Sequence, residues 1–113
     1  MNALETFLNN LNKPDFAFAC TLAFINEHYS YSPQAFKNGE VENAAGQNEG
    51  SCKTLSFALL ENLTTEQALR CFGEHYRDVL ATPDGQNHAN IRALIKHGLA
   101  GVVFSGPALV AKG

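Results

Sequence analysis

The segment DFAFACTLAFINEHY, residues 15–29, carries the clearest indication of how this chain folds. One apolar stripe recurs at helical spacing and consists of Phe18, Leu22, Ile25 and Tyr29. Much of the other side is also apolar, through Phe16, Ala17, Cys20, Ala23 and Phe24. A helix that is apolar nearly all round is expected to be buried. We therefore predict a helix over residues 16–29, with Asp15 as its N-cap, at the centre of the core.

Four further helices are predicted from apolar periodicity, over residues 2–12, 51–63, 65–81 and 88–97. Thr64 and Gln67 form a capping box before the helix over residues 65–81. Asn87 is the predicted N-cap of the last helix, and Gly98 ends it.

Residues 30–50 differ in character, because they are rich in Ser, Asn, Gly and Pro and show almost no period. A long irregular segment inside a compact domain often carries function. Tyr29, Tyr31 and Phe36 flank this segment. They are either core lining or an exposed aromatic patch, and an exposed patch would mark a groove for a partner or ligand.

The C-terminal segment GVVFSGPALV, residues 101–110, has β-branched residues between glycines and predicts a strand over Val102–Phe104. AFKNG at 35–39 and VVFSG at 102–106 both place a Phe shortly before a Gly, so we predict that they pair. The predicted fold is mainly α. It is a compact single-domain bundle of four to five helices over residues 1–113, with an irregular Asn/Gly-rich segment and a minimal two-stranded β element.

Composition and charge exclude several classes of protein. The 113 residues are 45% hydrophobic and 17% charged, which fits one globular domain. The net charge of −3, with no basic block, disfavours binding to nucleic acid or to an anionic membrane surface. No apolar run is long enough to span a bilayer, and the N-terminus does not resemble a secretory signal.

The three cysteines, Cys20, Cys52 and Cys71, form no CxxC pair. Each lies in a predicted helix beside apolar neighbours, so we expect reduced thiols in the core of a cytoplasmic protein. Cys52, in the first turn of its helix, would be a candidate nucleophile if it were exposed. Its position on the side of Leu55 and Leu59 favours burial instead.

Four blocks of sequence resemble the HopJ type III effector family: NAAGQNEGSCK (43–53), FGEHYRDVLATPDG (72–85), HANIRALIKHG (88–98) and GVVFSGPAL (101–109). The resemblance extends from the predicted helix 16–29 to the C-terminus. It implies a bacterial protein associated with type III secretion, but no biochemical activity and no catalytic residue. Effectors usually begin with a flexible, Ser-rich leader, whereas this chain begins with the predicted helix 2–12.

Titratable side chains are concentrated between residues 72 and 98, where the turn Thr82-Pro83-Asp84-Gly85 makes two helices neighbours. We predict that these side chains converge at this corner: His75, Asp78, His88 and Arg92. Asp78 could orient a histidine that acts as a general base or metal ligand, and Arg92 could hold a carboxylate or phosphate.

The alternative is a buried polar network that fixes the helix corner, with a salt bridge from Arg92 to Asp78 or Asp84. Two histidines fall short of the three protein ligands of a catalytic zinc site, so no metal or cofactor is expected. Glu74 and Arg77 are predicted on the solvent face, with Arg70 paired to Glu74. His97 is assigned to a helix end.

A second candidate lies in GQNEGSCK, residues 46–53, which leads into a helix N-terminus. Its free N–H groups could bind an anion, with the candidate residues Asn48, Gly50, Ser51 and Lys53. It is not a P-loop, because the GK[ST] order is absent. Asn48 or Ser51 acting as a helix cap accounts for most of the same pattern.

Two hypotheses for function follow. The leading one is a HopJ-type, non-enzymatic binding protein of the bacterial cytoplasm, or exported by type III secretion, that recognises a host or bacterial protein or a small molecule. The alternative is a small hydrolase or metal-assisted enzyme that uses His75, Asp78, His88 and Arg92. The sequence does not determine the oligomeric state.

Overall fold

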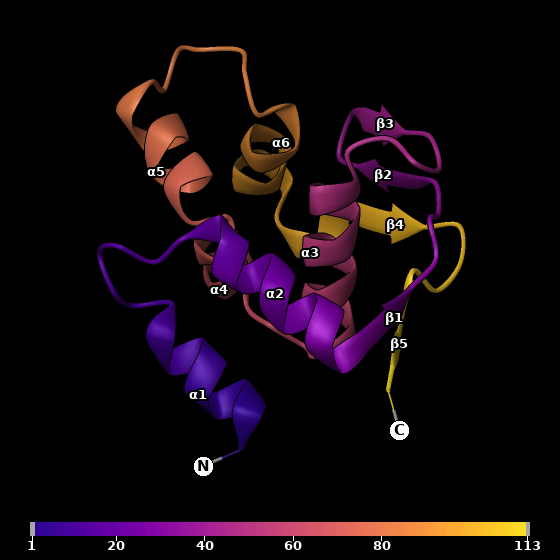
Figure 1. The fold of residues 1–113 in the computed structure, drawn as a ribbon. Helices are drawn as coiled ribbons and strands as arrows, with labels where there is room; N and C mark the ends of the chain where they lie inside the picture. Colours follow the sequence, from indigo (N-terminus) through magenta and orange to yellow (C-terminus); the bar gives the residue numbers. More distant parts are fainter. Residues whose placement is uncertain (1, 113) are drawn as a thin grey trace.

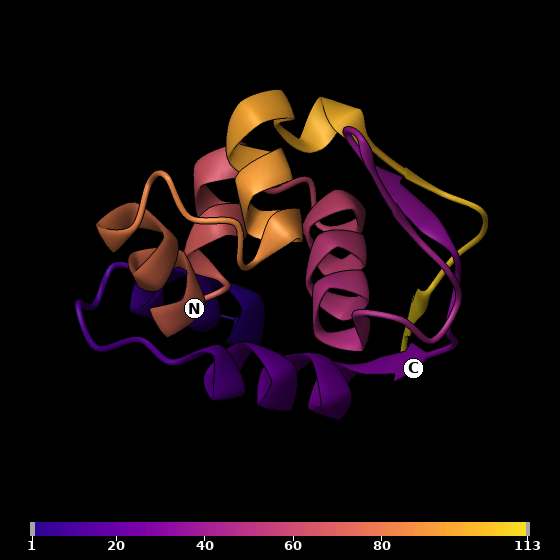
Figure 2. The same ribbon diagram turned by 90° about the horizontal axis from the view of Figure 1, so that it is seen from above.

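Helix α3, Glu49–Leu60, is the centre of the fold in the computed structural model, which describes residues 2–112. Figures 1 and 2 show the other helices and the strands arranged around it. Its buried residues are Cys52, Thr54, Leu55, Phe57 and Ala58. The prediction that the helix over residues 16–29 is central is therefore wrong. That helix is α2, Phe18–His28, and only Thr21 and Ile25 are buried within it.

The outer face of α2 explains the error. Ala19, Cys20 and Ala23 are exposed there. They are small enough to lie at the surface with little apolar area in water, although they resemble core residues in a sequence pattern. The expectation that all three cysteines are core thiols fails for the same reason, since only Cys52 and Cys71 are buried.

The other helices within residues 2–112 are α1 (Ala3–Asn10), α4 (Thr65–Arg70), α5 (Glu74–Ala81), α6 (Ala89–His97) and the 3-10 turn η1 (Leu99–Gly101). The predicted single helix over residues 65–81 is wrong, because the chain breaks at Gly73, with φ 57° and ψ −125°. Before the break, the capping box of Thr64 and Gln67 is confirmed. After it, Gly98 ends α6 with φ 71°, as predicted.

The break at Gly73 lets α5 hold the start of α2. The N-cap of α2 is Ala17, not the predicted Asp15, and it has no capping side chain. Instead the Phe18 N–H donates to Glu74 Oε1 over 2.7 Å, and Arg77 Nη1 donates to the Phe16 carbonyl over 2.8 Å. Glu74 and Arg77 are therefore not free solvent-face charges, and Arg70 pairs with Glu66 rather than with Glu74.

Two small antiparallel sheets complete the fold. The first has the order β3-β2-β4, with β2 over Phe36–Asn38, β3 over Val41–Asn43 and β4 over Val102–Phe104. Phe36 lies opposite Phe104 and stacks on it with ring centroids 4.9 Å apart, which confirms the predicted pairing. The second sheet, which the sequence did not predict, pairs β1 (Tyr29–Tyr31) with β5 (Leu109–Ala111).

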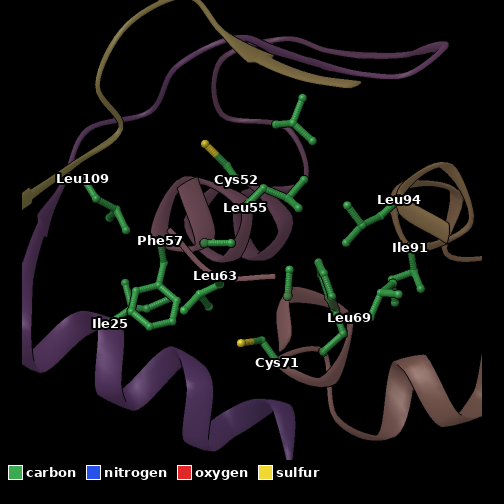
Figure 3. Packing of buried hydrophobic residues seen from close by; sticks show 14 of the residues in the cluster. Ile25, Cys52, Leu55, Phe57, Leu63, Leu69, Cys71, Ile91, Leu94 and Leu109 are labelled. Atoms are coloured by element: carbon green, nitrogen blue, oxygen red, sulfur yellow. The ribbon is translucent and has the colours of Figure 1, made fainter. Parts of the chain in front are cut away.

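The aromatic residues around the irregular segment line the core. Tyr29 and Phe36 are buried, Tyr31 packs against the core, and the Tyr29 hydroxyl donates to Glu61. Figure 3 shows core side chains from α2, α4, α6 and β5 gathered around α3. Fully burying one large apolar side chain, such as Phe57 or Leu94, contributes about 1.5–3 kcal/mol. Within residues 2–112, no helix is both long and apolar enough to cross a bilayer.

Candidate functional site

Four asparagine side chains hold the beginnings of two helices together. Asn38 and Asn43 come from β2 and β3, Asn48 precedes α3, and Asn90 lies in the first turn of α6. Asn43 and Asn90 exchange two amide hydrogen bonds of 3.0 and 3.2 Å. Asn48 Nδ2 donates to Asn43 Oδ1 over 2.6 Å, and Asn38 Nδ2 donates to the Asn90 carbonyl over 2.8 Å. This network, in which Asn38, Asn43 and Asn90 are buried and Asn48 is exposed, fixes the starts of α3 and α6 relative to each other.

Both helix starts have unusual caps. Asn48 precedes α3 with φ 50°, and His88 precedes α6 with φ 53°, so each non-glycine residue adopts the left-handed region. Neither side chain caps its own helix. Asn48 does occupy the predicted cap position, but its amide bonds to Asn43 instead. The predicted cap at Asn87 is wrong, because His88 takes that place.

A cleft of about 350 Å³ opens between these two helix starts. Its walls are Asn48, Gly50 and Ser51 at the start of α3, residues 88–91 at the start of α6, and Phe18, Phe72 and His75. None of these lining residues is Asp, Glu, Lys or Arg. The volume is at the lower end of the range for ligand sites, about 300–1,000 Å³, so the cleft suits a small ligand.

Two imidazole rings lie side by side in this cleft. The ring centroids of His75 and His88 are 5.0 Å apart. His88 Nε2 lies 3.2 Å from Asp78 Oδ2, and Asn87 Nδ2 donates to the same oxygen over 3.3 Å. A carboxylate bonded to one ring nitrogen orients the imidazole. The structure therefore brings His75, Asp78 and His88 together, as the spacing around the TPDG turn predicted.

Arg92 serves a different purpose from the one predicted. Its guanidinium donates to oxygens of the connection between α5 and α6, namely the Asn87 carbonyl (2.6 Å), the Thr82 carbonyl (2.9 Å) and Asn87 Oδ1 (2.7 Å). These bonds replace the predicted salt bridge to Asp78 or Asp84. Arg92 thus shapes the loop that places His88, and it is not among the residues that line the cleft.

The second predicted site divides in the same way. Asn48, Gly50 and Ser51 line the cleft beside the two histidines. Lys53 does not: its Nζ donates to Asn26 Oδ1 over 3.1 Å and lies 4.8 Å from the centre of the Tyr31 ring. Two candidates that are separate in the sequence therefore form one cleft, without the lysine of one and the arginine of the other.

Several other titratable side chains form contacts outside the cleft or are buried in the core. His97 lies 3.3 Å from Glu40 rather than only ending its helix, and Lys96, hydrogen-bonded to the same carboxylate, lowers the pKa of Glu40. The hydrogen bond from the Phe18 N–H lowers the pKa of Glu74, and burial raises the pKa of Cys71 to about 12. Across residues 2–112, no group of three or more His, Cys, Asp or Glu side chains is placed to share a metal ion.

Sequence reasoning missed the asparagine network and the part that Phe18 plays in the cleft. The available signal was the high Asn content of residues 30–50 together with Asn90 in the first turn of α6. Buried amides need partners from other segments. Four asparagines near predicted turns and helix starts were therefore a reason to expect a network, although not to assign its pairs.

The fold and cleft define a small, mainly helical domain with two minor antiparallel sheets and a histidine-lined cleft. The model of the HopJ type III effector protein family matches residues 4–109. The chain belongs to this family. Among solved structures, it is similar to the crystal structure of VPA0580, a protein of unknown function, with a TM-score of 0.90 and 42% identity over 99% of this chain and 95% of that one. A comparison with curated proteins gave no match.

Proposed function

We propose that this HopJ-family protein is a non-enzymatic binding protein whose cleft takes a small anionic ligand. One observation carries the proposal: two helices begin at the same cleft, and the two imidazole rings of His75 and His88 lie between them. The start of a helix carries a partial positive charge and unbonded N–H groups, which favour an anion. An imidazole adds hydrogen-bond donors and, when protonated, a full positive charge.

The surrounding charges support the same ligand class. No carboxylate is among the residues that line the cleft, and the two that contact its imidazoles, Glu74 and Asp78, lie outside that wall. Asp78 bonds to one ring nitrogen of His88 and orients that imidazole, and it is not among the residues that line the cleft. The asparagine network holds both helix starts in place before a ligand arrives, and such preorganisation lowers the cost of binding.

Membership of the HopJ family also bears on where the protein meets its ligand or partner. We propose that the ligand or partner is met either in the bacterial cytoplasm or after export by type III secretion, as the family description implies. A protein partner that presents a carboxylate or phosphate would satisfy the same cleft chemistry as a free small molecule.

The test is a titration of the protein with inorganic phosphate and with acetate. Binding is measured by isothermal titration calorimetry and by the shifts of the backbone amide signals in NMR spectra. We expect the largest shifts at residues 48–51 and 88–91. The double variant His75→Gln/His88→Gln should weaken binding at least tenfold, because hydrogen bonds to charged groups contribute about 1.5–3 kcal/mol each. His28→Gln is the matched control, since His28 lies on α2 next to Glu27 and outside the cleft. Equal affinity of wild type and double variant would reject the proposal.

A small hydrolase is the second candidate, favoured by the 3.2 Å contact of His88 with Asp78. A carboxylate-oriented imidazole can act as a general base towards a bound water. Hydrolysis of p-nitrophenyl phosphate or p-nitrophenyl acetate distinguishes the two functions. Turnover that is lost in His88→Gln and kept in His28→Gln would support the hydrolase. Binding without turnover supports the binding protein.

A further inference from the structure

We infer that the ligand of this cleft carries a flat aromatic ring next to its anionic group, an inference that rests on the anion site proposed above. The aromatic side chains of the wall carry it. Phe18 and Phe72 stack with centroids 5.6 Å apart and planes 15° apart. His75 meets Phe18 edge-on at 5.2 Å, and His88 lies 5.0 Å from His75. All four rings line the cleft and form one aromatic strip.

The strip is apolar at one end and polar at the other. The end formed by Phe18 and Phe72 offers aromatic carbon, while the end formed by His75 and His88 offers ring nitrogens, with Asp78 next to His88 and Glu74 next to His75. A ligand with its anionic group at the imidazoles has no polar partner along the phenylalanines. The complementary group there is an apolar ring, because aromatic pairs prefer stacked or edge-on contacts at centroid distances of about 4.5–7 Å.

Phe18 is the more exposed of the two phenylalanines. Phe72 is buried, whereas Phe18 at the start of α2 is only half-buried although it packs on the core. Its ring also lies against the first turn of α3, where a Cβ on Gly50 would come within 3.1 Å of Phe18 Cζ. Glycine at position 50 therefore lets this helix start, with its N–H groups, approach the edge of the aromatic ring closely.

The space is sufficient for such a ligand. A cavity of about 150 Å³ can hold benzene, and this cleft measures about 350 Å³. A phenyl ring along the strip leaves room for one phosphate or carboxylate group at the imidazoles. A long or branched ligand would extend beyond the walls.

Three probes that share one anionic group test the inference: inorganic phosphate, phenyl phosphate and cyclohexyl phosphate. Phenyl phosphate is expected to bind at least about tenfold more tightly than inorganic phosphate, from apolar burial, and about threefold more tightly than cyclohexyl phosphate, from ring stacking. Phe18→Leu should remove most of the gain of phenyl phosphate over inorganic phosphate, with both affinities measured in the same variant. Phe104→Leu is the control, because Phe104 in β4 is also part-buried and stacked, but on Phe36 of β2 and outside the cleft.

The outcomes separate this inference from the proposed function. If inorganic phosphate binds at residues 48–51 and 88–91 but phenyl phosphate binds no more tightly, the aromatic inference fails and the anion site stands. If no phosphate binds, the anion site fails and the inference with it. If Phe18→Leu does not fold, NMR spectra of phenyl phosphate bound to the wild-type protein still test the stacking. Upfield ring-current shifts of the phenyl protons support stacking, and unshifted protons in the bound state overturn it.

Discussion

Gly73 is the residue whose substitution should most clearly test how the cleft is built. It separates α4 from α5 with φ 57° and ψ −125°, a conformation that is essentially restricted to glycine. A Cβ at this position would lie 2.5 Å from the Phe18 nitrogen and 3.0 Å from the Phe16 carbonyl oxygen. Both neighbours are backbone atoms, so no side-chain rotation can relieve the contact. Gly73→Ala must therefore displace either the start of α2 or the start of α5.

The magnitude follows from a comparison with Gly46→Ala. Gly46 also has a positive φ, of 86°, but no atom lies within 4 Å of a Cβ built there. Its substitution costs only the backbone strain, about 1 kcal/mol, less the gain from a stiffer unfolded chain. Gly73→Ala carries similar strain plus the clash, and overpacking typically costs a further 1–3 kcal/mol. We expect Gly73→Ala to lower the free energy of unfolding by about 3 kcal/mol and Gly46→Ala by less than about 1 kcal/mol.

Urea unfolding, monitored by circular dichroism, measures the free energy of unfolding of both variants. At roughly 4 °C per kcal/mol for a domain of this size, the two midpoints of thermal unfolding should differ by about 8–10 °C. A Gly73→Ala variant that unfolds within about 0.5 kcal/mol of Gly46→Ala would contradict the reasoning. It would show that the backbone at the break moves freely and that Phe18 and His75 are not held by it.

Three further predictions follow from groups outside the histidine pair. Native protein should react with a thiol reagent at Cys20 alone, while Cys52 and Cys71 react only in denaturant, because both are buried and the pKa of Cys71 is raised to about 12. The lowered pKa of Glu74 means that its contribution is present above the unfolded pKa, about 4.3, and is lost as the pH falls through the lower folded value. Glu74→Gln should accordingly be less stable than wild type in urea at pH 7, by at most about 1 kcal/mol because this half-exposed carboxylate is screened by solvent, and the difference should shrink as the pH falls through the lowered folded pKa. Asn90→Ala leaves buried amides of the network without partners, and a loss of about 2–3 kcal/mol in the same assay is expected; a loss below about 0.5 kcal/mol would show that the network is not cooperative.

Local signals in the sequence predicted local features well. The capping box of Thr64 and Gln67, the end of α6 at Gly98 and the hydrogen-bonded turn from Thr82 to Gly85 all involve residues at most four apart, and the structure has each of them. Such features depend on propensity and on short-range hydrogen bonds, which few tertiary contacts override.

The predictions that failed concern contacts between distant segments. The helix over residues 65–81 breaks at Gly73 because α5 must hold the start of α2, 56 residues away in the sequence. Periodicity could not show this, since the apolar stripe continues across the break. The prediction that α2 is buried failed for a related reason. The small residues on its outer face match a core pattern in the sequence, although they are exposed in the structure.

What the sequence by itself determined is a mainly helical single domain, the meeting of His75 and His88 across a short turn, and the pairing of Phe36 with Phe104. Only the tertiary structure brought residues 48–51 next to His75 and His88, through hydrogen bonds between the side-chain amides of Asn43, Asn48 and Asn90. The physical reason is that a buried amide can bond to many partners. The partner it takes is set by how whole elements pack, and no periodic pattern in the sequence records that choice.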